Sequence, residues 1–256
     1  MMKSIRKIFI IVLASAGIRL DKLTDGRIDA MLFILIGYVS HTLISKYITL
    51  QLSLVYFLVL FAIRYVYLFG GFMKNGFSGR MIDKLGEEKA WNLYEMLTSI
   101  MFFQRGLSFG LLTQDTQWSI LSITGALGST DIMVFKHICM GLGVVLILIG
   151  FWVNITATYV IGIDTYYYKD LFLKRFLTDF KVEGPYKYFA NPMYGIGQSS
   201  GYGAALMVGS VAGIFATLLN QIMIYIFYFL IEKPHINAML KKESLNEVGS
   251  IGIINA

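Results

Sequence analysis

The residues best suited to chemistry lie in the last third of the chain, between about Gly162 and His235. The segment 162–200 is the least apolar part of this region and carries five Lys or Arg residues together with four acidic ones. Its tyrosines are Tyr166, Tyr167, Tyr168, Tyr186, Tyr188 and Tyr194. Two interpretations stand at this level: a built site, or a solvated loop bordered by tyrosines at a membrane interface.

Glycines crowd the start of the apolar stretch that follows. They are Gly195, Gly197, Gly201 and Gly203. Each weakens a helix interior by ~1 kcal/mol relative to alanine, a cost usually offset by the close approach of a ligand or another helix. A GxG near a helix start also occurs in dinucleotide sites, but that fingerprint needs a preceding strand within a βαβ unit. No such unit is predicted here.

The elements that must position these residues are membrane helices. Of the 256 residues, 56% are hydrophobic and 15% charged, and the mean hydropathy is +0.65. A soluble domain carries roughly 25% charged residues. The apolar stretches 30–47, 49–72 and 132–161 each approach or exceed the ~20 residues that cross a bilayer. Every backbone amide there must be bonded within its own segment, so the sequence predicts an all-α, polytopic transmembrane bundle.

We expect about six spans, at 29–46, 50–71, 93–112, 133–160, 196–209 and 213–231. The last two would form a C-terminal helical hairpin, because the apolar run between Tyr194 and Glu232 would extend ~55 Å as one helix. A turn near 209–213 would return Glu232 to the membrane face at which Tyr194 lies. Two polar ends that are distant in sequence would thereby meet.

The charges follow the topology of such a bundle. The net charge is +6, and the basic residues cluster at 3–27, 74–89, 169–187 and 233–242, whereas 112–131 has no Lys or Arg. This is the positive-inside pattern, which places both termini in the cytoplasm and attributes the basic balance to topology and anionic lipid headgroups. We expect no nucleic-acid partner. The lone Cys139 excludes an intrachain disulfide and a cysteine-based zinc site, and no metal site is expected.

The first residues imitate a signal peptide, with Lys3, Arg6 and Lys7 before a short apolar run and small residues at 14–16. More basic residues follow at once, and export of the new end would put the basic loops outside. We therefore expect an interfacial or half-buried amphipathic helix within 1–27.

The string GPYKYFANPMY at 184–194, the small-residue stretch after it, the apolar hairpin and the closing Glu232-Lys233-Pro234 resemble a known family. They are similar to the carboxyl-terminal core of integral membrane S-adenosylmethionine-dependent methyltransferases. This family includes phospholipid (phosphatidylethanolamine) N-methyltransferases and isoprenylcysteine carboxyl methyltransferases. Residues 141–166 are similar to the span and cofactor segment of the phospholipid branch, which the Asn-Pro-Met-Tyr string also favours. The resemblance covers roughly 140–236. Lys233 stands where the family has a second acid, and Ala190 where many members carry arginine.

The resemblance implies one membrane domain with N-terminal helices in 1–130, a catalytic core that binds the cofactor in 131–236 and a short tail in 237–256. It implies S-adenosylmethionine as cofactor and methylation of the amine of phosphatidylethanolamine or its mono- and dimethyl forms. The membrane would be endoplasmic reticulum in a eukaryote or inner membrane in a bacterium. The cofactor-binding residues would be Gly162, Asp164, Tyr186, Tyr188, Asn191, Pro192, Tyr194, Gly197, Gly203 and Glu232.

In such a site tyrosine faces would attract the sulfonium, and Glu232 could accept hydrogen bonds from the ribose or amino group. Glu232 and His235 are the candidate general bases that would remove the proton of the substrate amine. Arg64, Glu95 and Arg105 lie in or near expected spans, where ionisable side chains are costly. They would line a headgroup cavity or pair with one another.

Two alternatives remain open. The same fold could methylate the carboxylate of a prenylated cysteine. A non-enzymatic channel or transporter is a rival from another class, but it predicts paired polar interruptions in matching halves of the chain. Here the polar motif is concentrated at one end.

Overall fold

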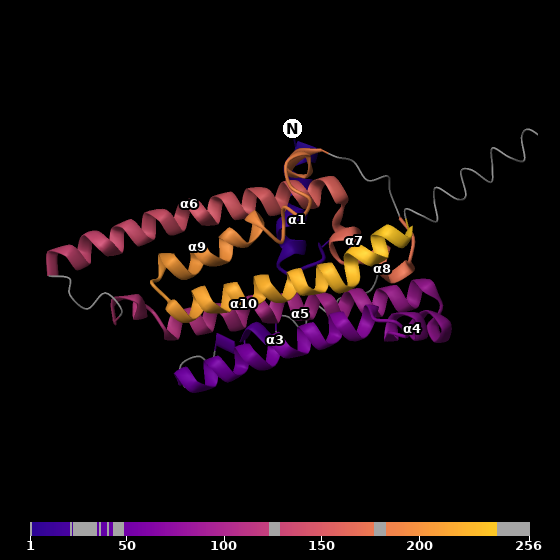
Figure 1. Ribbon diagram of the computed structural model, residues 1–256, viewed down its shortest axis with the longest axis horizontal. Helices are drawn as coiled ribbons and strands as arrows, with labels where there is room; N and C mark the ends of the chain where they lie inside the picture. Colours follow the sequence, from indigo (N-terminus) through magenta and orange to yellow (C-terminus); the bar gives the residue numbers. More distant parts are fainter. Residues whose placement is uncertain are drawn as a thin grey trace, which may run out of the picture.

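A computed structural model describes residues 2–20, 22, 35, 37–39, 41–42, 49–122, 129–176 and 183–239, and every regular element among them is a helix. Figure 1 shows the long helices side by side. They are α3 (Leu50–Phe72), α5 (Glu87–Asp115), α6 (Ser129–Ile161) and α10 (Val211–Phe227). The predicted all-α bundle is confirmed for these residues.

Three helical stretches are long and apolar enough to cross a membrane, at Gln51–Phe72, Asp131–Ile161 and Val211–Met239. Their outward faces carry large exposed apolar side chains, such as Val59 and Val66 on α3 and Leu148 and Trp152 on α6. Water-facing helices would not present such faces, whereas lipid would cover them. The expected spans 50–71, 133–160 and 213–231 correspond to these three stretches.

The expected span 93–112 lies inside α5, which packs antiparallel to α3. Its 29 residues reach ~44 Å at 1.5 Å per residue, so its length suffices to cross a bilayer. Polar side chains lower its hydropathy, among them Glu95, which is fully buried in the protein. The expected span 29–46 falls mostly outside the described residues.

The expected span 196–209 is shorter than predicted. A 3₁₀ turn, Ile196–Gln198, leads into α9 (Ser199–Met207), whose nine residues reach only ~14 Å. The helix packs closely against α6: a side-chain Cβ added at Gly203 would lie 2.5 Å from the carbonyl oxygen of Gly143. The glycines therefore let two helices approach, and α9 crosses only part of a ~30 Å hydrocarbon layer.

The hairpin between α9 and α10 is present, and its turn ends at Ser210. Gly209 adopts φ +64°, a left-handed conformation that glycine adopts without strain. The Ser210 hydroxyl caps α10 by accepting the N–H of Gly213 at 2.9 Å. From the segment after α5, the N–H of Trp118 donates to the carbonyl of Val208. The turn is thus held at the end of the bundle away from the basic loops.

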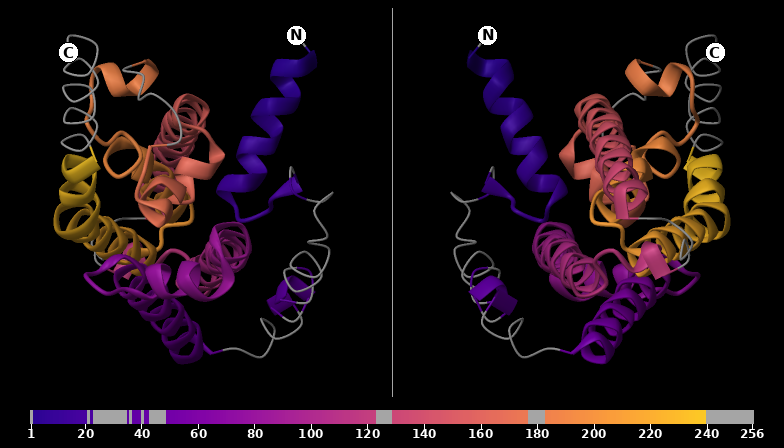
Figure 2. Two further views of the ribbon diagram at one scale, coloured as in Figure 1. Left: turned by 90° about the vertical axis from the view of Figure 1, so that its right-hand side faces the viewer. Right: turned by 90° about the vertical axis from the view of Figure 1, so that its left-hand side faces the viewer.

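Helix α1 (Met2–Ser15) runs at a steep angle to the bundle, because Figure 2 shows it along its length while α5 and α6 are seen nearly end-on. Its 14 residues reach ~21 Å, too short to cross a bilayer. Ile11 and Ala14 are buried and Phe9 is exposed. Tyr167 donates a 2.7 Å hydrogen bond to the carbonyl of Ala14, so α1 is attached to the region of the expected site.

Short elements gather at the basic end of the bundle, where α4 (Phe77–Leu85), α7 (Ile163–Tyr166) and α8 (Lys169–Leu173) are labelled in Figure 1. A 3₁₀ turn, η3 (Gly184–Lys187), begins the loop before α9, and η2 (Ser119–Ser122) follows α5. Beneath the basic end lies an aromatic core that includes Phe72, Trp91, Tyr94, Phe172 and Phe227. This core supports the helix ends that form the site.

Candidate functional site

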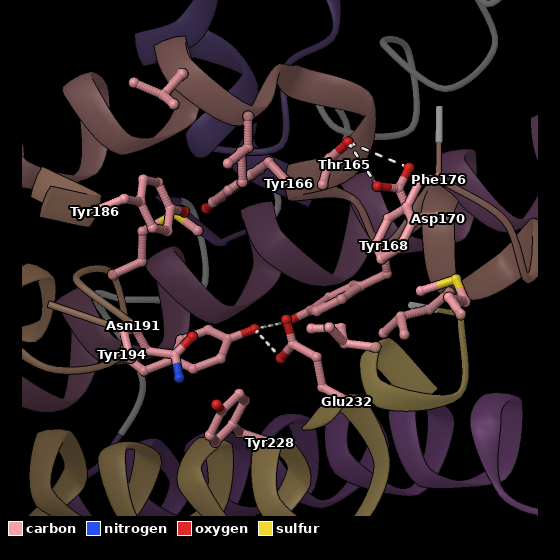
Figure 3. A pocket seen from close by; sticks show the side chains of 17 residues that line it. Thr165, Tyr166, Tyr168, Asp170, Phe176, Tyr186, Asn191, Tyr194, Tyr228 and Glu232 are labelled. Atoms are coloured by element: carbon pink, nitrogen blue, oxygen red, sulfur yellow. Dashed lines mark hydrogen bonds between the residues drawn. The ribbon is translucent and has the colours of Figure 1, made fainter. Parts of the chain in front are cut away.

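A cavity of about 330 Å³ opens where the loop before α9 faces the end of α10. Its polar lining residues are Thr165, Tyr166, Tyr168, Asp170, Tyr186, Asn191, Tyr194, Tyr228 and Glu232. Figure 3 shows these side chains converging on one space from three parts of the chain. Apolar walls come from the end of α6 at Val160 and Ile161. The cavity is therefore lined mainly by aromatic and apolar side chains, with Asp170 and Glu232 as its acidic groups.

Tyr194 and Glu232 meet in this cavity, although the whole hairpin separates them in sequence. The Tyr194 hydroxyl donates a 2.9 Å hydrogen bond to Oε2 of Glu232. The hydroxyl oxygen of Tyr168 lies 3.5 Å from that of Tyr194 (Figure 3). The predicted meeting of the two ends of the hairpin is confirmed.

An irregular turn at the end of α10 directs the Glu232 side chain into the cavity. The α-helical pattern of α10 ends at Phe227 and is followed by a π-helical turn, Tyr228–Glu232. Such a turn contains one more residue than an α-helical turn and is frequent at functional sites. Both Tyr228 and Glu232 line the cavity.

The backbone around Tyr194 is held by hydrogen bonds from its own loop and from α10. Within the loop, the N–H of Gly195 donates to Asn191, and the N–H of Gly197 donates to Pro192. From α10, the Gln221 amide donates to the Tyr194 carbonyl at 3.1 Å. The Asn-Pro-Met-Tyr string therefore forms a compact turn that presents Tyr194 and Asn191 to the cavity.

Gly162 and Asp164 form the junction between α6 and α7 rather than the cavity wall. Gly162 has φ +86°, and no atom lies within 4 Å of an added Cβ. The left-handed backbone conformation, rather than lack of space, therefore accounts for a glycine at this position. Asp164 accepts from Arg19 at 3.0 Å and from Lys169 at 2.8 Å. Arg19 also pairs with the buried Glu95. Partial burial opposes ionisation of Asp164, but Lys169 and Arg19 outweigh it and lower the pKa of its carboxyl.

The electrostatics of the cavity suit a cation. Among the described residues that line it, none is Lys, Arg or His. Burial raises the pKa of the Tyr186 and Tyr194 phenols, and the negative charge of Glu232 adds to the shift. Both phenols therefore stay neutral near pH 7, and Tyr194 remains a donor. Tyrosine faces beside a carboxylate attract positively charged groups.

Some of the other predicted residues line this cavity and others do not. Tyr186 and Asn191 line it. Pro192 is buried beneath the loop, and Tyr188 is 80% exposed and outside the lining. His235 is also outside the lining, which Ile236 reaches instead.

Of the other two predicted glycines, Gly197 lies beside a polar side chain and Gly203 beside a helix. Asn154 of α6 donates to the Gly197 carbonyl at 2.9 Å, and a Cβ on Gly197 would collide with it. The close approach at Gly203 is that of α6, as described above. The crowding of glycines thus reflects helix packing as well as the site.

Sequence reasoning left Tyr168, Tyr228 and Asp170 out of the predicted site. Tyr168 has φ +68°, an uncommon conformation for a residue with a side chain, and it immediately precedes α8. The Thr165 hydroxyl lies 3.3 Å from both carboxylate oxygens of Asp170. The three successive tyrosines after Gly162 were the available signal, but only the fold shows which of them face the cavity.

The comparison with protein families decides the identity of this part of the chain. Residues 138–243, which contain the Asn-Pro-Met-Tyr turn, the hairpin and Glu232, match the family described as phospholipid methyltransferase. This segment belongs to the phospholipid methyltransferase family. The family expected from the sequence strings is confirmed, and every residue that lines the cavity lies in the phospholipid methyltransferase segment.

Curated relatives point the same way. A protein of Kluyveromyces lactis named phosphatidylethanolamine N-methyltransferase is 33% identical over 112 residues, 43% of this chain and 13% of the relative. Proteins of the same name from Botryotinia fuckeliana and Malassezia globosa are 25% and 27% identical over 140 and 151 residues, 54% and 58% of this chain. Each of these two alignments covers 14% of the relative's own length. No solved structure matches the chain significantly.

Proposed function

We propose that this protein uses S-adenosylmethionine to methylate the amine of a phospholipid headgroup, phosphatidylethanolamine or its mono- and dimethyl forms. The single observation that carries the proposal is the meeting of Tyr194 and Glu232 in an aromatic cavity of the phospholipid methyltransferase segment. The name of these relatives, phosphatidylethanolamine N-methyltransferase, supports the choice of lipid.

The cavity fits both positively charged partners of such a reaction. When bound, S-adenosylmethionine supplies a methyl group attached to a positively charged sulfur. Tyr186, Tyr194 and Tyr228 present aromatic rings to the cavity, and each ring near a cation contributes ~0.5–2 kcal/mol. Gly162 and Asp164 would act indirectly, by setting the angle at which α7 leaves α6.

Glu232 is the residue placed to remove a proton from the substrate. The amine enters as an ammonium ion and must lose a proton before its nitrogen can accept a methyl group. Glu232 is the acid at the end of the hairpin, and the hydrogen bond from Tyr194 leaves its second carboxylate oxygen for the ammonium. His235 does not line the cavity, so we assign the proton to Glu232.

The same electrostatics disfavour the prenylated cysteine as acceptor. Its carboxylate would have to lie beside Glu232 and Asp170, and like charges in one partly buried site repel each other. A channel or transporter would not need an acid held by a tyrosine in a cavity closed by a hairpin. The lipid amine remains the substrate class that the cavity favours.

The protein would work within a membrane, with the cavity at the basic, cytoplasmic end of the bundle. In a eukaryote this membrane would be the endoplasmic reticulum and in a bacterium the inner membrane. The lipid then reaches the cavity from the bilayer and S-adenosylmethionine reaches it from the cytoplasm.

The test is methyl transfer by the purified protein in lipid vesicles, with labelled S-adenosylmethionine and phosphatidylethanolamine. We expect label in mono-, di- or trimethylated lipid, and a rate for Glu232→Gln that is lower by ~10²–10⁴-fold, the usual contribution of a general base. Glu183→Gln, an exposed acid of the same segment, is the matched control and should keep the full rate. No label in lipid, with unchanged S-adenosylmethionine affinity in Glu232→Gln, would refute the proposal; label on a prenylcysteine substrate would select the rival.

A further inference from the structure

A second, smaller cavity of about 130 Å³ lies behind the first and has polar walls. Tyr166, Tyr168, Met193 and Tyr194 line both cavities, so they form a shared partition (three of these residues are labelled in Figure 3). Beyond the partition the walls come from α3, α5, α6 and the start of α9. They include Arg64 of α3, Arg105 of α5, Asn154 of α6, and Gln198 and Ser200 near the start of α9.

The two arginines of this polar cavity lack an anionic partner. Arg64 is only 5% exposed; its Nη1 donates to Asn220 at 2.6 Å, but its Nε is buried without a hydrogen-bond partner. Arg105 is half-buried in the same cavity. In the part of the chain that the structure describes, no carboxylate pairs with either arginine. Two cations in one cavity, one buried and one half-buried, are costly unless an anion compensates them.

The anion that fits is a phosphate ester. Arginine presents a planar fork of donors that matches phosphate and carboxylate oxygens, and two guanidinium groups together offer more donors than one carboxylate can accept in ideal geometry. We propose that the polar cavity binds the phosphodiester of the lipid substrate while the amine of the same headgroup extends past Tyr194 into the aromatic cavity. This inference rests on the proposed function and names how its substrate is held.

The order of the two cavities along the bundle distinguishes the lipid phosphate from the carboxylate of the methyl donor. Asn154 precedes Val160 on α6, so the polar cavity lies ~9 Å farther from the basic end than the wall of the aromatic cavity. Arg64 lies within the membrane-crossing stretch Gln51–Phe72. In a lipid the phosphate lies between the acyl chains and the amine, so a deeper anion site and a shallower cation site match its headgroup. A water-soluble donor that enters from the basic end reaches the aromatic cavity first.

Calorimetric binding measurements without turnover test this arrangement. The protein in detergent is titrated with dihexanoyl-phosphatidylethanolamine, with S-adenosylmethionine and with inorganic phosphate. We expect Arg64→Gln and Arg105→Gln to weaken lipid binding at least tenfold and to leave S-adenosylmethionine affinity within twofold. Arg80→Gln, an exposed arginine of α4, is the matched control and should change neither affinity. Inorganic phosphate should displace the short-chain lipid poorly.

Other outcomes overturn the inference. Weakened S-adenosylmethionine binding with intact lipid binding would assign the arginines to the carboxylate of the methyl donor. Unchanged affinities for both ligands would show that the arginines bind water rather than either ligand. Displacement of the lipid by inorganic phosphate at equal concentration would mark a free-phosphate site. If the variants do not fold, the affinities of the wild-type protein test the inference. It should bind dihexanoyl-phosphatidylethanolamine at least tenfold more tightly than dihexanoylglycerol, which lacks the phosphate. Arginine-dependent lipid binding without any methyl transfer would refute the proposed function but not this inference.

Discussion

Tyr194 is the residue on which both cavities depend. It borders the aromatic cavity and the polar one, donates to Glu232, and lies edge-on to the ring of Tyr228 with ring centroids 6.3 Å apart. Because its phenol stays neutral, it can hold the charged carboxylate without releasing its own proton. We therefore expect its hydroxyl to contribute more to the rate of methyl transfer than its ring does.

We predict that Tyr194→Phe lowers kcat/KM for lipid methylation by ~10–100-fold, since a hydrogen bond to a charged group contributes ~1.5–3 kcal/mol. The ring and its packing remain, so folding should be unaffected. Tyr188→Phe is the matched control, because Tyr188 is exposed and outside the lining. Steady-state rates of methyl transfer measure both. Equal rates for Tyr194→Phe and wild type would remove the Tyr194 hydroxyl from the mechanism.

Among the elements, α9 shows how glycines bring two helices together. An alanine at Gly203 would place its Cβ 2.5 Å from a backbone oxygen of α6, an atom that cannot rotate away. We predict that Gly203→Ala destabilises the fold by ~1–3 kcal/mol, the usual cost of overpacking. Gly141→Ala, on the same helix pair but with open space around its Cβ, should be neutral or stabilising. Thermal unfolding in detergent, followed by tryptophan fluorescence, compares the two; an unchanged unfolding temperature for Gly203→Ala would contradict the packing.

The junction of α6 and α7 gives a pH-dependent prediction. Asp164→Asn removes the pairs with Arg19 and Lys169, and it should cost about 1 kcal/mol or less at neutral pH, because a third of the side chain is exposed. The lowered pKa of Asp164 means that its contribution is present above the ordinary value of ~3.9 and is lost as the pH falls through the folded value. The difference in unfolding temperature between wild type and Asp164→Asn should therefore shrink below about pH 4. A difference independent of pH would show that the charge does not contribute.

The sequence allowed the hairpin and the meeting of Tyr194 with Glu232 to be predicted, because chain length against bilayer thickness leaves few alternatives. It did not allow the short α9 to be predicted, since an apolar run with glycines looks the same whether it crosses a membrane or packs against α6. The sequence indicated that Arg64 and Arg105 line a headgroup cavity or form pairs, but it did not show which other residues complete the polar cavity. Arg64 and Arg105 come from helices outside the phospholipid methyltransferase segment, and their meeting with Tyr168 and Gln198 depends on packing that no local pattern records.

At the scale of the whole molecule, helix α6 connects the two ends of the bundle. Figure 1 shows α7, α8 and α4 at one end, and the far end of α5 with the start of α6 at the other. The first end carries basic residues of α4 and α8 and the aromatic cavity, and the second carries Gln117 and the turn at Gly209. From the positive-inside pattern we predict that the first end lies in the cytoplasm. Under the proposed function, the methyl donor would then enter from that side.

This orientation is testable with single cysteines in a Cys139→Ser background, which removes the lone native thiol. Lys187→Cys lies in the basic loop and Gln117→Cys at the opposite end, and both positions are exposed. In intact cells a membrane-impermeant maleimide should label position 117 at once and position 187 only after permeabilisation, because α6 spans the ~30 Å between them. Labelling of both from one side would show that α6 does not cross the membrane. The reverse pattern would keep the crossing but place the aromatic cavity outside, where the methyl donor would not reach it from the cytoplasm.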